Sequence, residues 1–90
     1  MDLETAIKLH IEDKRKWIHP NNNPILNEYV EVQVKIIEKA PRDRKSLENR
    51  IARKKQEMKD AREAIITDKL FTELQALEQL YHIVRRYETV

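Results

Sequence analysis

Glycine is absent from this sequence, whereas ninety residues of average composition would contain about six. Glycine adopts the backbone conformations that tight turns, phosphate-binding loops and close ligand approaches require. Its absence excludes glycine-rich phosphate loops and dinucleotide-binding fingerprints. Because residues 42–90 also contain no proline, this half of the chain has no strong helix breaker. The composition therefore predicts a helical protein.

Cysteine is also absent, so the chain forms no disulfide bond and has no thiolate for catalysis or metal binding. The N-terminal segment carries acidic side chains where a secretory signal would be basic. No apolar stretch approaches the roughly 20 residues that a membrane-spanning helix needs. We therefore expect a soluble, cytoplasmic protein that does not bind membranes.

Residues suited to catalysis or metal binding are few and scattered. Ser46 is the only serine, and its place near the start of an expected helix suits a capping role. His10, His19 and His82 are the only histidines, and they lack the spacing of a metal site. We therefore expect a protein that is not an enzyme and has no cofactor and no metal.

Charge is abundant for so small a chain. Charged residues make up 38% of the sequence and apolar residues 40%. A domain of this length buries only about 60–65% of its unfolded surface, so its core is of marginal size. The 18 basic and 16 acidic residues leave a net charge of +2, too small to indicate nucleic acid by itself. The length predicts one domain, residues 1–90, and the richness in charge predicts either elongated helices or the help of a partner.

Apolar periodicity and turn signals divide the chain into four expected helices. Asp2 can cap the first, and Asn23 followed by Pro24 is a strong start for the second. The asparagines at 21–23 tolerate left-handed conformations and can replace glycine in a turn. Pro41 ends the second helix, because proline disfavours helical geometry at the residue before it. The expected helices are 3–18, 24–40, 43–66 and 68–88.

The last two expected helices differ in character. The third has a thin heptad-like seam that includes Lys54, whereas the fourth is apolar over more than half of its circumference. The apolar seam changes phase within residues 66–69, which predicts a turn near Thr67 between two separate helices. The alternative is that both segments form one extended helix whose seam is covered by a second chain. The predicted fold is all-α, a small bundle of three to four helices with a coiled-coil-like C-terminal hairpin.

The broad apolar face of the last helix predicts contacts with other helices or with a second chain. Two interpretations of Lys54 are open. Either its stem packs in the seam while its ammonium group reaches solvent, or it is a polar seam residue that selects the alignment of the helices. We expect a helical protein–protein interaction module, an adaptor, regulator or inhibitor, that self-associates, first as a homodimer. The candidate interface residues are Leu70, Leu74, Leu77, Tyr81, Val84, Tyr87 and Lys54.

A basic segment, residues 42–62, supports an alternative hypothesis. Its nine basic and four acidic residues could follow nucleic-acid phosphates, or could pair along one solvated helix. Residues 49–52 resemble the start of a leucine-zipper basic region, but Arg53 and Glu57 stand where that family has alanine and arginine, so we do not assign it. The candidate nucleic-acid-binding residues are Arg44, Arg50, Lys55, Lys59 and Arg62.

A third hypothesis places a small anionic ligand at a subunit interface, held by Arg85 and Arg86. Tyrosine and arginine, which are mixed in this C-terminal segment, are enriched at interfaces. The simpler interpretation is that the two arginines favour the negative end of the helix dipole. The sequence leaves both interpretations open.

Overall fold

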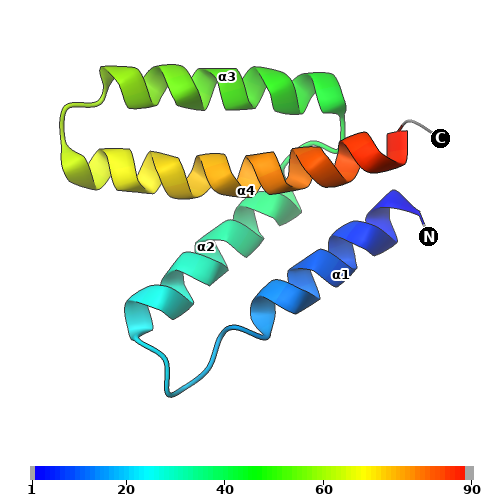
Figure 1. Ribbon diagram of the computed structural model, residues 1–90, viewed down its shortest axis with the longest axis horizontal. Helices are drawn as coiled ribbons and strands as arrows, with labels where there is room; N and C mark the ends of the chain where they lie inside the picture. Colours follow the sequence, from blue (N-terminus) through cyan, green and yellow to red (C-terminus); the bar gives the residue numbers. More distant parts are fainter. Residues whose placement is uncertain (1, 89–90) are drawn as a thin grey trace.

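The computed structural model describes residues 2–88. Its four α-helices are α1 (Leu3–Arg15), α2 (Pro24–Lys39), α3 (Arg44–Asp60) and α4 (Ala64–Glu88). No strand occurs among the described residues, and the all-α prediction is confirmed. Figure 1 shows two pairs of neighbouring helices, α1 with α2 and α3 with α4, each pair running in opposite directions. Coiled-coil-like packing of the second pair stays a prediction.

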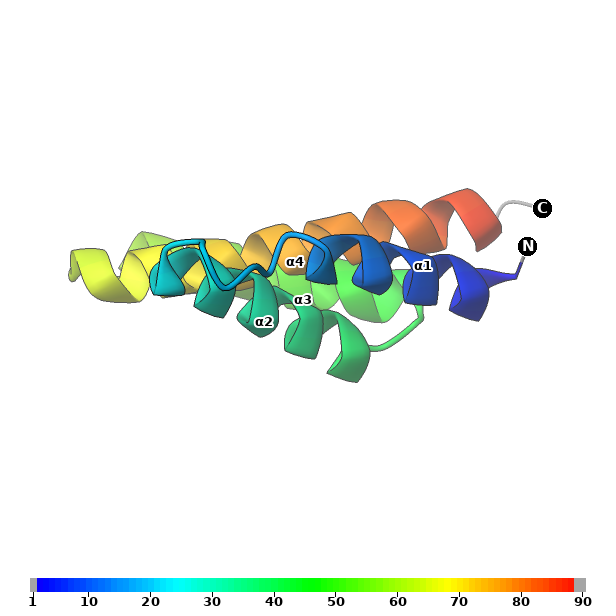
Figure 2. The ribbon, with the colours of Figure 1, turned by 90° about the horizontal axis from the view of Figure 1, so that it is seen from below.

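The helices form a thin, open arrangement around α4. Helix α4 contacts each of the other three helices, and α1 also contacts α2. Within residues 2–88, no Cα atom of α2 lies within 8 Å of one in α3. Figure 2 shows how shallow the molecule is, with extents of 41 × 36 × 16 Å. Its radius of gyration of 14.0 Å exceeds the roughly 12 Å of a compact domain of this length.

The apolar core lies along α4, as the width of that helix's apolar face predicts. Leu80 and Val84 of α4 are fully buried, and each of the other helices contributes to the same cluster. Helix α3 contributes one buried side chain, Leu47, in agreement with its thin seam. The core residues are Ile7, Ile37, Ala40, Leu47, Ala76, Leu77, Leu80 and Val84.

The starts of the first three helices follow from local capping. The side chains of Asp2, Asn23 and Asp43 accept hydrogen bonds from the backbone N–H groups of the first helical turn. Each bond satisfies a donor that has no partner within its helix. The predicted starts of α1 and α2 are confirmed, and Asp43 rather than Ser46 caps α3.

The turn after α1 differs from the sequence expectation in two respects. Helix α1 ends at Arg15 and not at residue 18, because the N–H groups of Trp17 and Ile18 bond to carbonyls three residues back and tighten the chain. The asparagines also act without left-handed geometry, since no described residue has a positive φ. Asn22 Nδ2 instead donates to the Trp17 carbonyl at 2.6 Å.

The turn between α3 and α4 lies earlier than expected. Helix α3 ends at Asp60 instead of residue 66, and α4 begins at Ala64 instead of residue 68. Ala61 makes the turn in an extended conformation, with φ −74° and ψ 130°, which needs no glycine. The N–H and the hydroxyl of Thr67 both bond to the Glu63 carbonyl, so Thr67 lies inside α4 and does not cap it.

Candidate interaction groove

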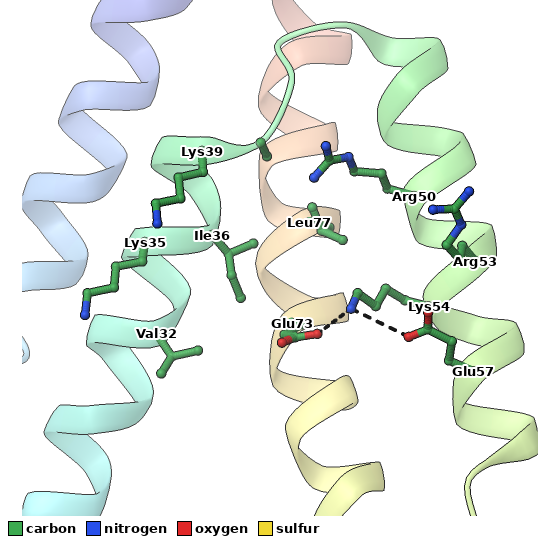
Figure 3. A pocket seen from close by; sticks show the side chains of 11 residues that line it. Val32, Lys35, Ile36, Lys39, Arg50, Arg53, Lys54, Glu57, Glu73 and Leu77 are labelled. Atoms are coloured by element: carbon green, nitrogen blue, oxygen red, sulfur yellow. Dashed lines mark ion pairs between the residues drawn. The ribbon is translucent and has the colours of Figure 1, made fainter.

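A groove lies between α2 and α3, with part of α4 between them (Figure 3). It exists because α2 and α3 both pack on α4, while their backbones stay more than 8 Å apart between Cα atoms over the described residues. Its volume is about 600 Å³, within the roughly 300–1,000 Å³ range of ligand pockets. The lining residues are Val32, Lys35, Ile36, Lys39, Ala40, Arg50, Arg53, Lys54, Glu57, Glu73 and Leu77.

The apolar part of the groove comes from α2, its C-terminal cap and α4. Val32 and Ile36 are one helical turn apart on α2, half-buried, and point toward α4 in Figure 3. Leu77 of α4 and Ala40 are buried beneath them. The local sequence explains this placement, because residues four apart share one face of a helix.

Lys54 holds both carboxylates of the groove. Its Nζ lies 2.6 Å from Glu73 Oε2 on α4 and 3.6 Å from Glu57 Oε2 on its own helix. The hydrogen bond to Glu73 is the main cause that raises the pKa of Lys54, with the charge of Glu57 adding to it. These three groups therefore neutralise one another in part and leave no carboxylate for the remaining cations of the groove.

Four exposed cations form the two rims of the groove, Lys35 and Lys39 on α2 and Arg50 and Arg53 on α3. None of the four has an ion pair within the part of the chain that the structure describes. Arg50 extends from α3 toward α4, whereas the ammonium groups of Lys35 and Lys39 point away from α3, on the side of α2 that faces α1 (Figure 3). The groove therefore combines an apolar floor with positively charged rims, a surface suited to a ligand that is apolar and anionic.

A buried polar network crosses a different part of the molecule. Gln33 of α2 is 2% exposed, and its Oε1 accepts a hydrogen bond from Lys14 Nζ at 2.7 Å. Its Nε2 donates to the Tyr29 hydroxyl at 3.1 Å, and Tyr29 in turn donates to Gln75 of α4. Burial lowers the pKa of Lys14. The network connects α1, α2 and α4. Its sign in the sequence is Gln33, the single polar residue on the apolar face of α2.

Most of the predicted interface residues pack within the single chain. Leu70, Leu74, Leu77 and Val84 are buried in the described structure, so a second chain reaches them only if this fold opens. Tyr81 is half-buried, and its hydroxyl donates to Glu48 Oε1 at 2.7 Å. Tyr87 borders a hollow near α1 that also includes Arg86.

The predicted nucleic-acid-binding residues do not gather at this groove. Arg50 lines the groove, whereas Lys55 borders another hollow on α3 and lies 3.7 Å from Glu78. Arg44 is paired with Glu48 at 3.4 Å. Lys59 and Arg62 are exposed at the far end of α3. Their role in binding stays a prediction.

Sequence reasoning missed the groove, because its rims come from two helices separated by a turn. Lys35, Lys39 and Arg53 each look like solvated residues when their own helix is considered alone.

Among residues 2–88, no group of three histidine, aspartate or glutamate side chains could hold a metal ion. Nor does any helix in that range have the length and apolar character to cross a membrane.

Comparisons with protein-family models, with curated proteins and with solved structures found no match to this chain. The groove's own geometry and charge are therefore the basis on which a function can be proposed.

Proposed function

We propose that this chain is a non-enzymatic helical interaction module, an adaptor, regulator or inhibitor that binds another protein through the α2–α3 groove. The observation that carries the proposal is the apolar floor of Val32, Ile36 and Leu77 between two cationic rims. Protein interfaces commonly place an apolar centre inside a polar rim. A helix laid in an apolar groove is also a recurrent mode of protein recognition.

The shape of the groove favours a protein ligand over a small molecule. A pocket for a small molecule usually buries 70–90% of that ligand, which requires walls on most sides. This groove is bordered by helices on its sides and by α4 beneath, and it is open to solvent above. An extended ligand that lies along the groove gains contact with both rims.

Self-association is a second property that we propose for the same chain. The thin arrangement leaves Trp17 70% exposed and Ile25 73% exposed, at the end of the molecule where α1 turns into α2. Trp17 also borders one hollow together with Leu26, which is 47% exposed, and a contiguous exposed apolar patch is typical of a surface that is covered in the assembled protein. A homodimer is the simplest assembly that covers them in both copies.

Nucleic-acid binding is less well supported. The cations of the rims suit phosphates, but a phosphate backbone makes no use of an apolar floor. Arg44 and Lys55 are also engaged by Glu48 and Glu78. This alternative predicts binding that weakens steeply with salt, and that is lost when charge is reversed on α3 outside the groove.

Affinity capture with matched variants tests the proposed function. Val32→Asp places a charge on the groove floor, and Phe71→Asp introduces a charge at an exposed apolar residue of α4 outside the groove. A partner retained by the wild type and by Phe71→Asp, but lost by Val32→Asp, supports the groove as the binding site. Equal capture by all three proteins overturns it. Circular dichroism establishes that each variant is folded.

A further inference from the structure

We propose that the occupant of the α2–α3 groove is an acidic amphipathic helix of a partner protein. Its apolar stripe would lie on Val32, Ile36 and Leu77, and its carboxylates would face the two rims. This inference rests on the proposed function and specifies the chemistry of the partner. The residues that carry it are the four rim cations, Lys35, Lys39, Arg50 and Arg53.

The charges of the groove select an anionic partner. Both of its carboxylates, Glu57 and Glu73, are held by Lys54 at 3.6 and 2.6 Å. The four rim cations take part in none of the ion pairs that the described side chains form. Complementary charge of this kind accelerates encounter and rejects partners of the wrong sign. A second copy of the chain brings a net charge of +2 and the same cationic rims, so it is a poor occupant.

The spacing of the rims suits a helix. Lys35 and Lys39 are four residues apart on α2, and Arg50 and Arg53 are three apart on α3, so the rims extend for about 6 Å and about 4.5 Å. A partner helix repeats its own side chains at the same three- and four-residue intervals. Glutamates on one side of an apolar stripe meet the arginines of α3, and those on the other side meet the lysines of α2 once their flexible stems turn toward the groove. An extended strand places alternate side chains on opposite faces and offers only one row to the groove.

The apolar floor favours an amphipathic helix over a nucleic acid as the occupant of the groove. Val32 and Ile36 are only half-buried by the chain itself and gain further burial only under an apolar ligand surface. Arg50, which extends toward α4 above Leu77 in Figure 3, can then pair with a carboxylate while its stem packs on the incoming helix. Binding should depend on both the floor and the rims.

Three synthetic peptides of about 18 residues, long enough to form a helix, test this inference against the full chain. The first has a leucine stripe flanked by glutamates, the second has the same stripe flanked by lysines, and the third has the first composition without a stripe. Isothermal titration calorimetry at low and high salt measures the affinities. The acidic amphipathic peptide is expected to bind at least about tenfold more tightly than either other peptide, and less tightly at high salt.

Charge reversal on α3 sharpens the test. Arg50→Glu with Arg53→Glu should weaken the acidic peptide at least about tenfold and should strengthen the lysine-flanked one. Lys45→Glu with Lys59→Glu makes the same change at exposed positions outside the groove and should alter both affinities less. Equal binding of the acidic and basic peptides by the wild type, or equal effects of the two double variants, overturns the inference.

A DNA duplex and the captured partner distinguish the remaining outcomes. If a short duplex binds more tightly than the acidic peptide, and Val32→Asp leaves that binding unchanged, the groove is a nucleic-acid site and the inference fails. If partner capture depends on Val32 but the acidic peptide does not bind, the proposed function stands and the partner's chemistry is wrong. If capture is independent of Val32, the proposed function itself fails.

Discussion

Lys54 Nζ lies 2.6 Å from Glu73 Oε2, and this ion pair connects α3 to α4 at the edge of the groove. Lys54 occupies a position in the thin seam of α3 that is otherwise apolar. Both side chains are less than a third exposed, at 28% and 20%. The pairing of this lysine with one particular carboxylate supports the interpretation that Lys54 selects the alignment of the two helices.

A double-mutant cycle on this pair measures that contribution. Lys54→Met and Glu73→Gln should each destabilise the chain, and their coupling energy should be about 0.5–1 kcal/mol, as for a partly exposed ion pair. Urea unfolding followed by circular dichroism gives the four free energies of unfolding. Lys55→Met with Glu78→Gln is the matched control, since that pair is more exposed and 3.7 Å long. A coupling at the Lys54 pair no larger than in the control would contradict the alignment role.

The same ion pair predicts a loss of stability at high pH. The hydrogen bond to Glu73 raises the pKa of Lys54 above its usual value of 10.5, so the folded chain binds this proton more tightly than the unfolded chain. Its stabilising effect is complete below pH 10.5 and is lost as the pH rises through the raised value. Urea midpoints measured on both sides of pH 10.5 should therefore fall less in Lys54→Met than in the wild type.

Half-buried Lys14 and buried Gln33 form a hydrogen-bonded pair whose two members depend on each other. Lys14→Met should destabilise the chain by about 1–3 kcal/mol, because it leaves the buried Oε1 of Gln33 without its donor. Adding Gln33→Leu removes the orphaned acceptor and should restore most of the lost stability, as replacements of buried polar pairs by apolar ones often do. Chemical denaturation of the two single variants and the double variant checks this. Simple additivity of the two losses would contradict it.

The cap of α3 predicts part of the response to acid. The backbone N–H of Ser46 lowers the pKa of Asp43 below its usual 3.8, so this carboxylate stabilises the fold above that pH and stops doing so as the pH falls through its lowered pKa. Asp43→Asn keeps a capping acceptor and does not titrate, whereas Asp43→Ala removes the cap. Asp43→Asn should lose less stability in acid than the wild type, and Asp43→Ala should already be less stable at neutral pH. Thermal unfolding across that pH range measures both differences.

The starts of the first three helices could be predicted from the sequence, because each depends on residues within one turn. Asp2 and Asn23 are followed directly by the helices that they cap. The helix ends were placed less well. Apolar periodicity continues past Asp60 to residue 65, but the chain turns at Ala61 so that α4 can pack back on α3. Tertiary packing of this kind overrides local periodicity.

The groove could not be predicted, because it depends on where two helices lie relative to a third. Lys39 and Arg50 are eleven residues apart and belong to helices whose Cα atoms are nowhere within 8 Å of each other in the described structure. They line one groove only because α2 crosses α4 obliquely while α3 runs alongside it (Figure 1). By contrast, Gln33 was detectable, since a polar residue on an apolar face must find partners when it is buried.

Trp17 makes the proposed homodimer measurable, because it is the only tryptophan and is 70% exposed in one chain. Burial of its indole in a dimer should shift its fluorescence to the blue as the protein concentration rises. Trp17→Ser should weaken association at least about tenfold, since a large apolar side chain at an interface contributes more than about 1.4 kcal/mol. Phe71→Ser, which changes an exposed aromatic residue of α4, is the control and should have less effect. Light scattering on a sizing column reports the mass directly, and a monodisperse species of 10.9 kDa at all concentrations would rule the dimer out.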